Sequence, residues 1–452
     1  MASLNYVAFN QDHSLLAAAT TRGLRVYTTD PFELSHHSDD RDISLVEQLF
    51  STSLVALVLT PRLLRIVNTK KERRDDNPQT QRNSTICELT FHGMVVSVRM
   101  NRKRLVVMLE EIVFIYDISN MKLLHQQLTP LNPTGICALS PSSDHNFLAL
   151  PHCEKSSTMA PSESSHVPKS IVKESISGDV LLYDLNKMSE VSVIQAHQTP
   201  VSHMAMNPDG TMLATSSEKG TVIRIFSIPD GKKLYQFRRG SIPARIYSMT
   251  FNATSTLLCV SSATETVHVF KIAAPGPSAA AGNGSDTVHE PHRRHGSHTT
   301  PPPGPTLARS PSPSTSETPS SLDREPAANT PPRQPRPPGF MSLLRRTSQG
   351  VSTNLVTRAA GYLPHSVTEL WEPQRDFAWC RVPRGRPAAT ATAAAVAGGG
   401  TSSTPVRSVV AMGNSGPHVL VATNEGDFYI YHVDLEKGGE GTLIQRFEYG
   451  KD

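Results

Sequence analysis

The sequence predicts an all-β protein, a seven-bladed β-propeller. Three observations lead to this fold. A unit of three short apolar strands recurs seven times along the 452 residues. Its strands are rich in β-branched residues, and tight turns separate them. A unit of this size cannot bury both of its faces alone, so seven copies are expected to stack around an axis.

The seven copies differ in clarity but share one order of strand, turn and strand. They are expected at residues 7–27, 54–67, 95–116, 136–184, 201–226, 246–270 and 406–431. The fifth copy is the clearest, because Asn207-Pro208-Asp209-Gly210 between two apolar runs is a strong hairpin signal. The Trp-Asp dipeptide that ends many WD repeats is absent. The blades are therefore interpreted as degenerate WD repeats.

Three insertions interrupt the repeats. Residues 154–177 are rich in Ser and Lys and indicate a loop inside the fourth blade. A longer loop, 273–363, is expected in the sixth blade, and its Pro/Ser-rich part, 273–338, is predicted to be disordered. An Ala/Gly/Thr-rich stretch, 387–404, is interpreted as a low-complexity linker. With these insertions, residues 1–452 are expected to form a single propeller.

Composition limits the classes of function. The net charge of +4 is mild, and no nucleic-acid partner is expected from it. The five cysteines are scattered without a Cys-x-x-Cys pair, which argues against a metal site or a disulfide framework and fits a reducing compartment. No cofactor is expected. No signal peptide is visible, and no apolar run reaches the length of a transmembrane helix. Any contact with a membrane is therefore expected to be peripheral.

The motif Phe237-Arg238-Arg239-Gly240 is the most informative part of the chain. It ends a segment that is predicted to be a strand, Lys233–Phe237. Neighbouring residues of a strand point to opposite faces, so the two arginines are expected to serve two different pockets. Arginine binds phosphate oxygens through strong, charge-assisted hydrogen bonds. The alternative is that both are surface arginines paired with carboxylates.

The motif and its flanking strands resemble those of the PROPPIN family, the autophagy-related WD-repeat proteins that bind phosphoinositides. The resemblance also covers Ser217–Phe226, Thr266–Phe270 and Leu363–Pro373, and it is closest to the fungal autophagy member with a long loop in the sixth blade. It implies binding of phosphatidylinositol 3-phosphate and phosphatidylinositol 3,5-bisphosphate. It also implies a cytoplasmic protein that associates with the membranes of the phagophore assembly site, the vacuole and the endosome.

Two headgroup sites are expected around the arginines. Hydroxyl, ammonium, imidazole and guanidinium donors without a carboxylate nucleophile or base suit phosphate binding and not hydrolysis, so no enzyme is expected. Ser262, Thr264, Thr266 and His268 alternate along the chain, and Ser261 remains a candidate because an intervening turn can break that alternation. Arg224 is interpreted as a structural ion-pair partner. The first site is expected to contain Arg238, Ser217, Lys219, Thr221 and His197, and the second Arg239, Ser261, Ser262, Thr264, Thr266 and His268.

Each of these residues also has an ordinary structural interpretation. Ser and Thr are common in turns because of their local hydrogen bonds. Lys219 can be a solvated charge, and His268 a structural histidine. It is the gathering of these residues around the motif that favours the binding sites.

The end of the long loop has the pattern of an amphipathic helix. Its apolar residues fall on one side at helical spacing, and the neighbouring Arg345 and Arg346 lie off that stripe. Such a segment, 340–362, is expected to insert into a membrane interface; a helix packed on the propeller flank is the alternative. The residues expected to insert are Phe340, Leu343, Leu344, Val351, Leu355 and Tyr362.

The resemblance also implies two protein partners. The loop Asn68–Asp76 and the strand near Thr85–Glu88 resemble a surface that engages an autophagy lipid-transfer protein. The cluster Asn101–Arg104 resembles a surface that recruits ubiquitin-like conjugation machinery in animal relatives. The alternative function for the whole chain is a generic WD-repeat scaffold that binds acidic protein partners.

Overall fold

The computed structural model describes residues 3–39, 41–70, 84–153, 176–272, 373–383 and 406–450. All of them belong to one of two units, Met1–Ala274 with His365–Asp452; the other unit, Pro275–Pro364, lies outside the described residues. The predicted low-complexity segments 273–338 and 387–404 and the predicted amphipathic segment 340–362 also lie outside them. Of the fourth-blade insertion, only Ile176 and Ser177 are described.

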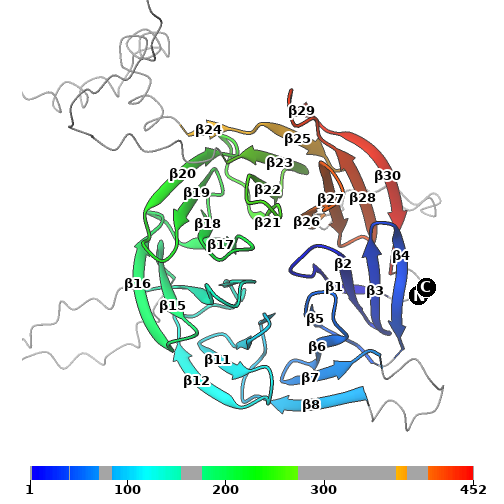
Figure 1. Ribbon diagram of the computed structural model, residues 1–452, viewed down its shortest axis with the longest axis vertical. Coiled ribbons are helices and arrows are strands. Elements are labelled where there is room, and N and C mark those ends of the chain that lie inside the picture. The colour runs from blue at the N-terminus through cyan, green and yellow to red at the C-terminus, as the bar shows by residue number, and fades with distance from the viewer. Residues whose placement is uncertain are drawn as a thin grey trace, which may run out of the picture. The chain divides into compact units, whose positions relative to one another are not determined.

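The described strands form seven separate sheets, and these are arranged as the blades of a ring (Figure 1). The predicted seven-bladed β-propeller is therefore confirmed. Blade 1 consists of β1 (Leu4–Phe9), β2 (Leu15–Thr20), β3 (Gly23–Thr29) and β4 (Phe32–Ser38). Blade 2 consists of β5 (Leu45–Gln48), β6 (Leu54–Thr60), β7 (Leu63–Asn68) and β8 (Thr85–Thr90). Blade 3 consists of β9 (Ser97–Met100), β10 (Arg104–Met108), β11 (Ile112–Asp117) and β12 (Leu123–Leu128).

The other four blades follow the same antiparallel order from the inner strand outward. Blade 4 consists of β13 (Ala138–Leu139), β14 (Phe147–Pro151), β15 (Asp179–Asp184) and β16 (Ser189–Gln195). Blade 5 consists of β17 (Val201–Met206), β18 (Met212–Ser217), β19 (Val222–Ser227) and β20 (Lys233–Arg238). Blade 6 consists of β21 (Ile246–Phe251), β22 (Leu257–Ser262), β23 (Thr266–Lys271) and β25 (Ala378–Arg381). Blade 7 consists of β26 (Ser408–Met412), β27 (His418–Thr423), β28 (Asp427–His432) and β30 (Thr442–Glu448).

Each blade has an outer strand that the three-strand sequence unit does not contain. Most residues of β4 and β30 are exposed, whereas β2 and β27 are almost entirely buried. Outer strands carry polar side chains towards solvent and so lack the apolar pattern by which the inner three strands are recognised. The repeat therefore predicts the inner part of each blade, except for β5 of blade 2, and misses the rim.

The hydrophobic core lies between neighbouring blades. Alternate residues of a strand face the preceding and the following blade, as the pleat requires. In blade 5, Leu213 packs towards blade 4, whereas Ala214 packs towards blade 6. Between blades 5 and 6, the rings of Phe237 and Phe270 stack with their centroids 4.9 Å apart. This alternation decides which side of blade 5 each polar residue near the motif can reach.

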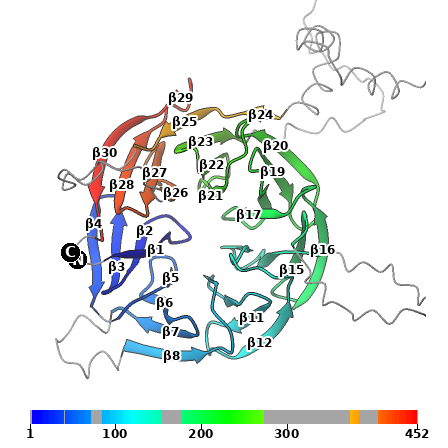
Figure 2. The same ribbon diagram turned by 180° about the vertical axis from the view of Figure 1, so that it is seen from behind.

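The ring closes between blade 7 and blade 1 without a shared strand, because the sheet of blade 1 contains only β1–β4 and that of blade 7 only β26, β27, β28 and β30. Both ends of the chain lie beside blade 1 (Figure 2). Aromatic side chains hold this junction: Phe32 stacks on Phe428 at 4.2 Å and on Tyr27 at 5.2 Å between ring centroids. The Tyr27 hydroxyl also accepts a hydrogen bond from the Gly450 amide at 3.1 Å.

Two short strands cover the outer edges of blades 5 and 6. β24 (Gln374–Arg375) pairs parallel to β20, and β29 (Gly439–Glu440) pairs parallel to β25. Chain that returns towards blade 6 therefore first runs along the rim of blade 5. No described helix is long and apolar enough to span a bilayer.

Candidate phosphate-binding site around the paired arginines

The motif lies at the end of β20, the outer strand of blade 5, which confirms the predicted strand Lys233–Phe237. Arg238 is the last residue of the strand and pairs with Val222 of β19. Its side chain is exposed, whereas Phe237 is buried towards blade 6 and Arg239 is only 6 % exposed. The two arginines thus lie in different surroundings, although they are adjacent in sequence.

The guanidinium of Arg239 donates hydrogen bonds to two backbone carbonyls, one before and one after it in the sequence. Its Nε donates to the Gly220 carbonyl at 2.9 Å, and its Nη2 donates to the Ile242 carbonyl at 2.6 Å. Burial lowers the pKa of this guanidinium. A guanidinium has five N–H donors, and three of those of Arg239 make no hydrogen bond to another described residue. Arg239 therefore braces the connection between blades 5 and 6 and still has donors to offer.

The first group of polar residues lies on the side of blade 5 that faces blade 4. Thr215 and Ser217 on β18 share this side with Leu213, which packs there, and Arg224 and Gln236 continue it onto β19 and β20. Arg238 lies two residues beyond Gln236 and has the same orientation. The structure thus brings Ser217 and Arg238 to one side of one sheet, as the sequence predicts.

His197 is held inside this group. Arg224 Nη1 lies 3.3 Å from His197 Nδ1, and His197 Nε2 lies 2.9 Å from the Thr215 hydroxyl. Because the guanidinium can only donate, Nδ1 accepts and Nε2 carries the proton. Burial, and then the Arg224 charge, lower the pKa of His197 to about 4. Both ring nitrogens are therefore occupied, and the ring is neutral at neutral pH.

Arg224 has a different role from the predicted one. Its partners are the Ala196 carbonyl at 2.6 Å, the Gln236 side-chain oxygen at 3.1 Å and the His197 ring. None of these is a carboxylate, so the interpretation of Arg224 as an ion-pair partner is wrong for the contacts among described residues. Burial lowers its pKa. Sequence reasoning missed Thr215 and Gln236, whose role follows only from the pairing of β18, β19 and β20.

Lys219 and Thr221 lie in the turn between β18 and β19. Lys219 is exposed and Thr221 is partly buried. The Gly220 amide donates to the Ser217 carbonyl, and Gly220 has a φ of +57°, so the turn interrupts the strand alternation. The assignment of Ser217, Lys219 and Thr221 to one site therefore does not follow from strand alternation, although all three lie near the end of β20.

The second group of polar residues lies on the side of blade 6 that faces blade 5. His268 shares this side with Phe270, which packs against Phe237, and Thr266 has the same parity. The hydroxyls of Ser262 and Thr264 lie 2.9 Å apart. Ser261 points the other way, towards blade 7, and donates to the Ser408 carbonyl at 2.8 Å. Of the two alternatives, the structure places Ser262, and not Ser261, with the other residues.

An open cavity of about 460 Å³ lies at this second group. Within it, His268 Nδ1 donates to Asp376 Oδ2 at 2.9 Å, and Nε2 makes no hydrogen bond to another described residue. Sequence reasoning missed Asp376 and Arg381. Both follow the long insertion, and only the pairing of β25 with β23 brings them to His268. The lining residues are Thr264, Glu265, Thr266, His268, Asp376, Trp379, Arg381 and Val382.

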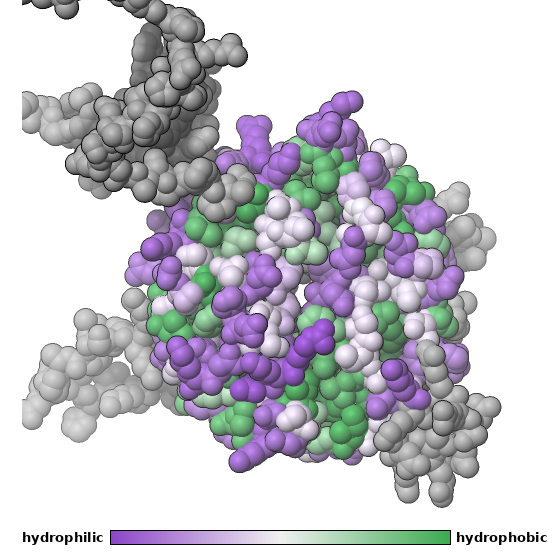
Figure 3. Space-filling model, in the orientation of Figure 1, coloured by the Kyte–Doolittle hydropathy of each residue, from purple (hydrophilic) through white to green (hydrophobic). Residues whose placement is uncertain are grey.

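The surface around this part of the rim is mostly hydrophilic. Hydrophilic side chains gather over β24, β25 and β29 in the upper part of Figure 3. Arg375 and Arg381 are exposed there, and Arg381 pairs with Glu440 at 3.3 Å. Among the described residues, no three His, Cys, Asp or Glu side chains form a group that could hold a metal ion.

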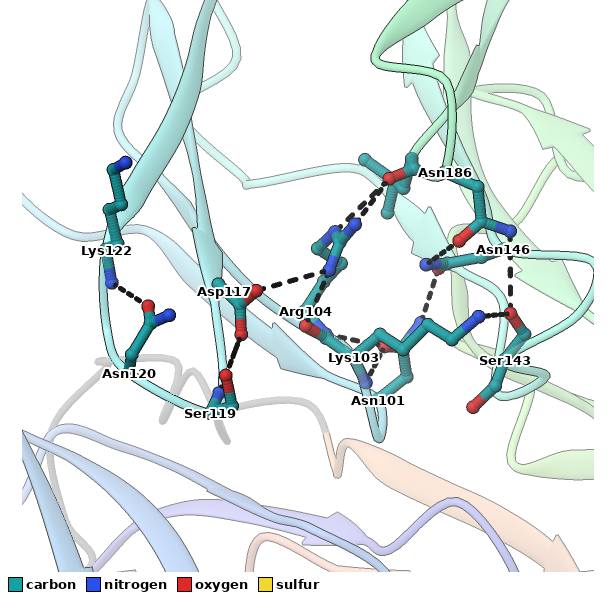
Figure 4. Close-up of polar contacts among 11 residues, drawn as sticks. Asn101, Lys103, Arg104, Asp117, Ser119, Asn120, Lys122, Ser143, Asn146 and Asn186 are labelled. Atoms are coloured by element: carbon teal, nitrogen blue, oxygen red, sulfur yellow. Dashed lines mark hydrogen bonds and ion pairs between the residues drawn. The ribbon is translucent and has the colours of Figure 1, made fainter.

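The basic cluster Asn101–Arg104 of blade 3 is largely engaged within the protein (Figure 4). Lys103 Nζ donates to the Ser143 carbonyl at 2.8 Å, and Arg104 donates to the Leu185 carbonyl from Nε at 3.2 Å and from Nη2 at 3.0 Å. Arg102 lies over the Phe50 ring, 4.1 Å from its centroid. These contacts join blade 3 to blades 2 and 4, so the cluster has a structural role beside any role in binding.

Known proteins resemble this chain along its whole length. Residues 3–281 match the model of the PROPPIN family. Autophagy-related protein 18 of Phaeosphaeria nodorum is 50% identical over 448 residues, which covers 98% of this chain and 100% of that protein. The Aspergillus clavatus protein of the same name is 46% identical over 446 residues, with the same coverage of both chains.

Solved structures share the fold at lower identity. Kluyveromyces lactis Hsv2 aligns with a TM-score of 0.60 and 15% identity, over 99% of each chain. A structure described as a complex of KlAtg21 with the coiled-coil of AgAtg16 aligns with a TM-score of 0.59 and 23% identity, again over 99% of each chain. The family match and the close fungal relatives carry the assignment, and the solved structures support the propeller fold. The chain therefore belongs to the PROPPIN family, the non-enzymatic, phosphoinositide-binding β-propellers of autophagy.

Proposed function

We propose that this propeller binds phosphatidylinositol 3-phosphate and phosphatidylinositol 3,5-bisphosphate through two headgroup sites, one on each side of the end of β20. The observation that carries the proposal is the position of the two arginines. Arg238 continues the polar side of blade 5 that faces blade 4, and Arg239 begins the connection to blade 6. N–H and O–H donors lie on blade 5 beside Arg238 and on the side of blade 6 that faces blade 5, and such donors suit phosphate oxygens.

The first site consists of Arg238, Ser217, Lys219 and Thr221. His197 supports it indirectly, because its ring holds Thr215 and Arg224 in place. The second site consists of Arg239, Ser262, Thr264, Thr266 and His268, with Arg381 as an added cation. Two weak sites on one rigid body act together on a membrane, so their combined affinity far exceeds that of either site.

The proposal includes membrane insertion by residues 340–362 and recruitment of autophagy partners to autophagosome precursor membranes. It also includes action at the vacuole and the endosome. For one protein partner, a coiled coil of the conjugation machinery, the support is the complex of KlAtg21 with the coiled-coil of AgAtg16 and the basic cluster of blade 3. The lipid-transfer partner is proposed for the surface that includes β8, where Arg65 pairs with Glu88 at 2.7 Å.

The proposal is tested by flotation of the purified chain with vesicles of neutral phospholipid, with and without a few per cent of either 3-phosphoinositide. Wild type is expected to float only with the phosphoinositide. Arg238→Thr with Arg239→Thr is expected to abolish this binding. A matched control, Lys232→Thr with Lys233→Thr, removes the same charge from the opposite end of β20 and is expected to bind as wild type does.

Two outcomes would overturn the proposal. One is wild-type binding that does not depend on the 3-phosphate. The other is equal loss of binding in both double variants, which would mean that general charge and not the motif is responsible. Thermal unfolding is measured for both double variants, because a loss of binding is interpretable only in a variant that is soluble and folded.

A further inference from the structure

The connection between β20 and β21 exposes a large apolar side chain at its tip. Ile242 is 73% exposed, and among the large hydrophobic residues that the structure describes only Leu128 is more exposed. Ser241 and Pro243 on either side of it are exposed as well. Ile242 belongs to none of the hydrophobic clusters between the blades. Its side chain therefore contributes nothing to the packing of the fold.

The backbone on both sides of this tip is bound to the neighbouring blades. On one side, the Arg239 amide donates to the Thr221 carbonyl at 2.9 Å, and the Arg239 guanidinium holds the Ile242 carbonyl. On the other side, the Ala244 amide donates to the Lys219 carbonyl at 3.1 Å, and the Arg245 carbonyl accepts from the Ala263 amide at 2.9 Å. The protein thus presents the isoleucine on a braced loop, which lowers the entropy lost when it is buried by a partner.

Cations surround the tip. Lys219, Arg238 and Arg245 are all exposed, and each lies on one of the segments to which the loop is bonded. Arg375 on β24 lies beside Arg238 in the register of the paired strands β20 and β24, and it is exposed too. Exposed basic residues are attracted to anionic lipid, and an apolar tip among them is the arrangement of a peripheral membrane contact.

We propose that the tip Ser241–Pro243, with Ile242 at its apex, inserts between lipid headgroups and forms an anchor that is separate from segment 340–362. The inference rests on the proposed phosphoinositide binding, because the tip lies between the two headgroup sites. Arg239 links the two functions, because its guanidinium holds the Ile242 carbonyl and the proposed function assigns the same side chain to the second headgroup site. Lipid capture and insertion of the tip therefore occur at one place on the rim.

The test compares Ile242→Asp with Leu128→Asp, which places the same charge at an equally exposed apolar residue on blade 3. Binding to vesicles of neutral phospholipid with phosphatidylinositol 3-phosphate is measured beside calorimetric binding of soluble inositol 1,3-bisphosphate. Ile242→Asp is expected to lose about tenfold in vesicle affinity, the effect of failing to bury one such side chain. Its affinity for the soluble headgroup is expected to stay within twofold of wild type, and Leu128→Asp is expected to change neither.

A second variant reports insertion directly. In Ile242→Trp, the introduced indole is expected to be quenched by brominated lipid far more than the wild-type background of two tryptophans. The inference is overturned if Ile242→Asp binds vesicles as wild type does. It is also overturned if the affinity of this variant for the soluble headgroup falls as much as its affinity for vesicles. If wild type itself binds neither vesicle nor soluble headgroup, the proposed function fails, and this inference fails with it.

Discussion

The two sides of the paired arginines differ in how their histidines are held. Towards blade 4, His197 lies between the Thr215 hydroxyl and the Arg224 guanidinium, and its pKa is lowered to about 4. Towards blade 6, His268 donates to the Asp376 carboxylate beside an open cavity, and its Nε2 makes no hydrogen bond to another described residue. One histidine is thus engaged through both ring nitrogens, and the other through one ring nitrogen among the described residues. Similar residues, chosen by one sequence pattern, thus take different roles.

The two adjacent arginines also differ, both in exposure and in hydrogen bonding. Arg238 is exposed and makes no side-chain hydrogen bond to another described residue, so its contribution is available charge. Arg239 is buried and braces the loop that separates the two sites. The arginine of the first site is therefore positioned by the sheet of blade 5. The arginine of the second site is positioned by the connection between blades 5 and 6.

The largest effect is expected for Gly220→Ala. Gly220 has a φ of +57°, and a Cβ there would overlap the Ala244 carbonyl oxygen. The cost in the free energy of unfolding is expected to be roughly 2–3 kcal/mol, because strain and a backbone clash add. Gly240→Ala is the control, since a Cβ at Gly240 meets nothing within 4 Å. Urea unfolding of both variants measures the difference, and equal stability would show that the bracing of this loop is unimportant.

The next effect separates the two arginines. Arg239→Ala leaves the Gly220 and Ile242 carbonyls without their buried donor and is expected to lower the free energy of unfolding by about 1–3 kcal/mol. Arg238→Ala is expected to change it by less than about 0.5 kcal/mol, because the side chain is exposed. Each is expected to leave partial vesicle binding. A stability loss in Arg238→Ala as large as that in Arg239→Ala would remove the distinction between an exposed ligand and a buried brace.

A smaller effect is expected from His197 in acid. Its pKa in the folded state, about 4, lies below the ordinary histidine value of 6.5, so between these values the unfolded chain binds a proton that the folded chain does not. Stability therefore falls as the pH falls from 6.5 towards 4. His203 contributes in the same direction, because burial lowers its pKa to about 4 as well. His197→Gln is expected to show a shallower fall than wild type over this window, measured by urea unfolding at several pH values; an unchanged slope would contradict the buried neutral ring.

The smallest effect on stability is expected for Asp376→Asn. The amide oxygen can still accept from His268, but one negative charge leaves the second cavity. Because that charge repels phosphate, vesicle binding at low salt is expected to rise a few-fold, with thermal unfolding unchanged. Glu111→Gln on blade 3 is the control, since it removes the same charge from an exposed carboxylate that does not line the cavity. Weaker binding in Asp376→Asn would show that the carboxylate acts mainly by orienting His268.

The number of blades, the inner three strands of every blade except β5 of blade 2, and the strand that carries the arginines could be predicted from the sequence alone. These follow from local alternation of apolar residues and from turn residues, which are readable without long-range contacts. The same signal assigned Ser217 and Arg238 to one region of blade 5. It failed for the outer strands of the other six blades, because a solvated strand at the rim lacks an apolar pattern.

The hydrogen-bond partner of each polar residue, by contrast, could be identified only in the folded structure. The carboxylate of Asp376 lies 108 positions after His268 in the sequence and reaches it through the pairing of β25 with β23. The choice between Ser261 and Ser262 needed the register of β22, and the partners of Arg224 and Arg239 needed the packing of blade on blade. Strand periodicity predicts which face of the sheet a side chain lies on. The residue that contacts it on that face comes from another segment, and the alternation along one strand does not identify that segment.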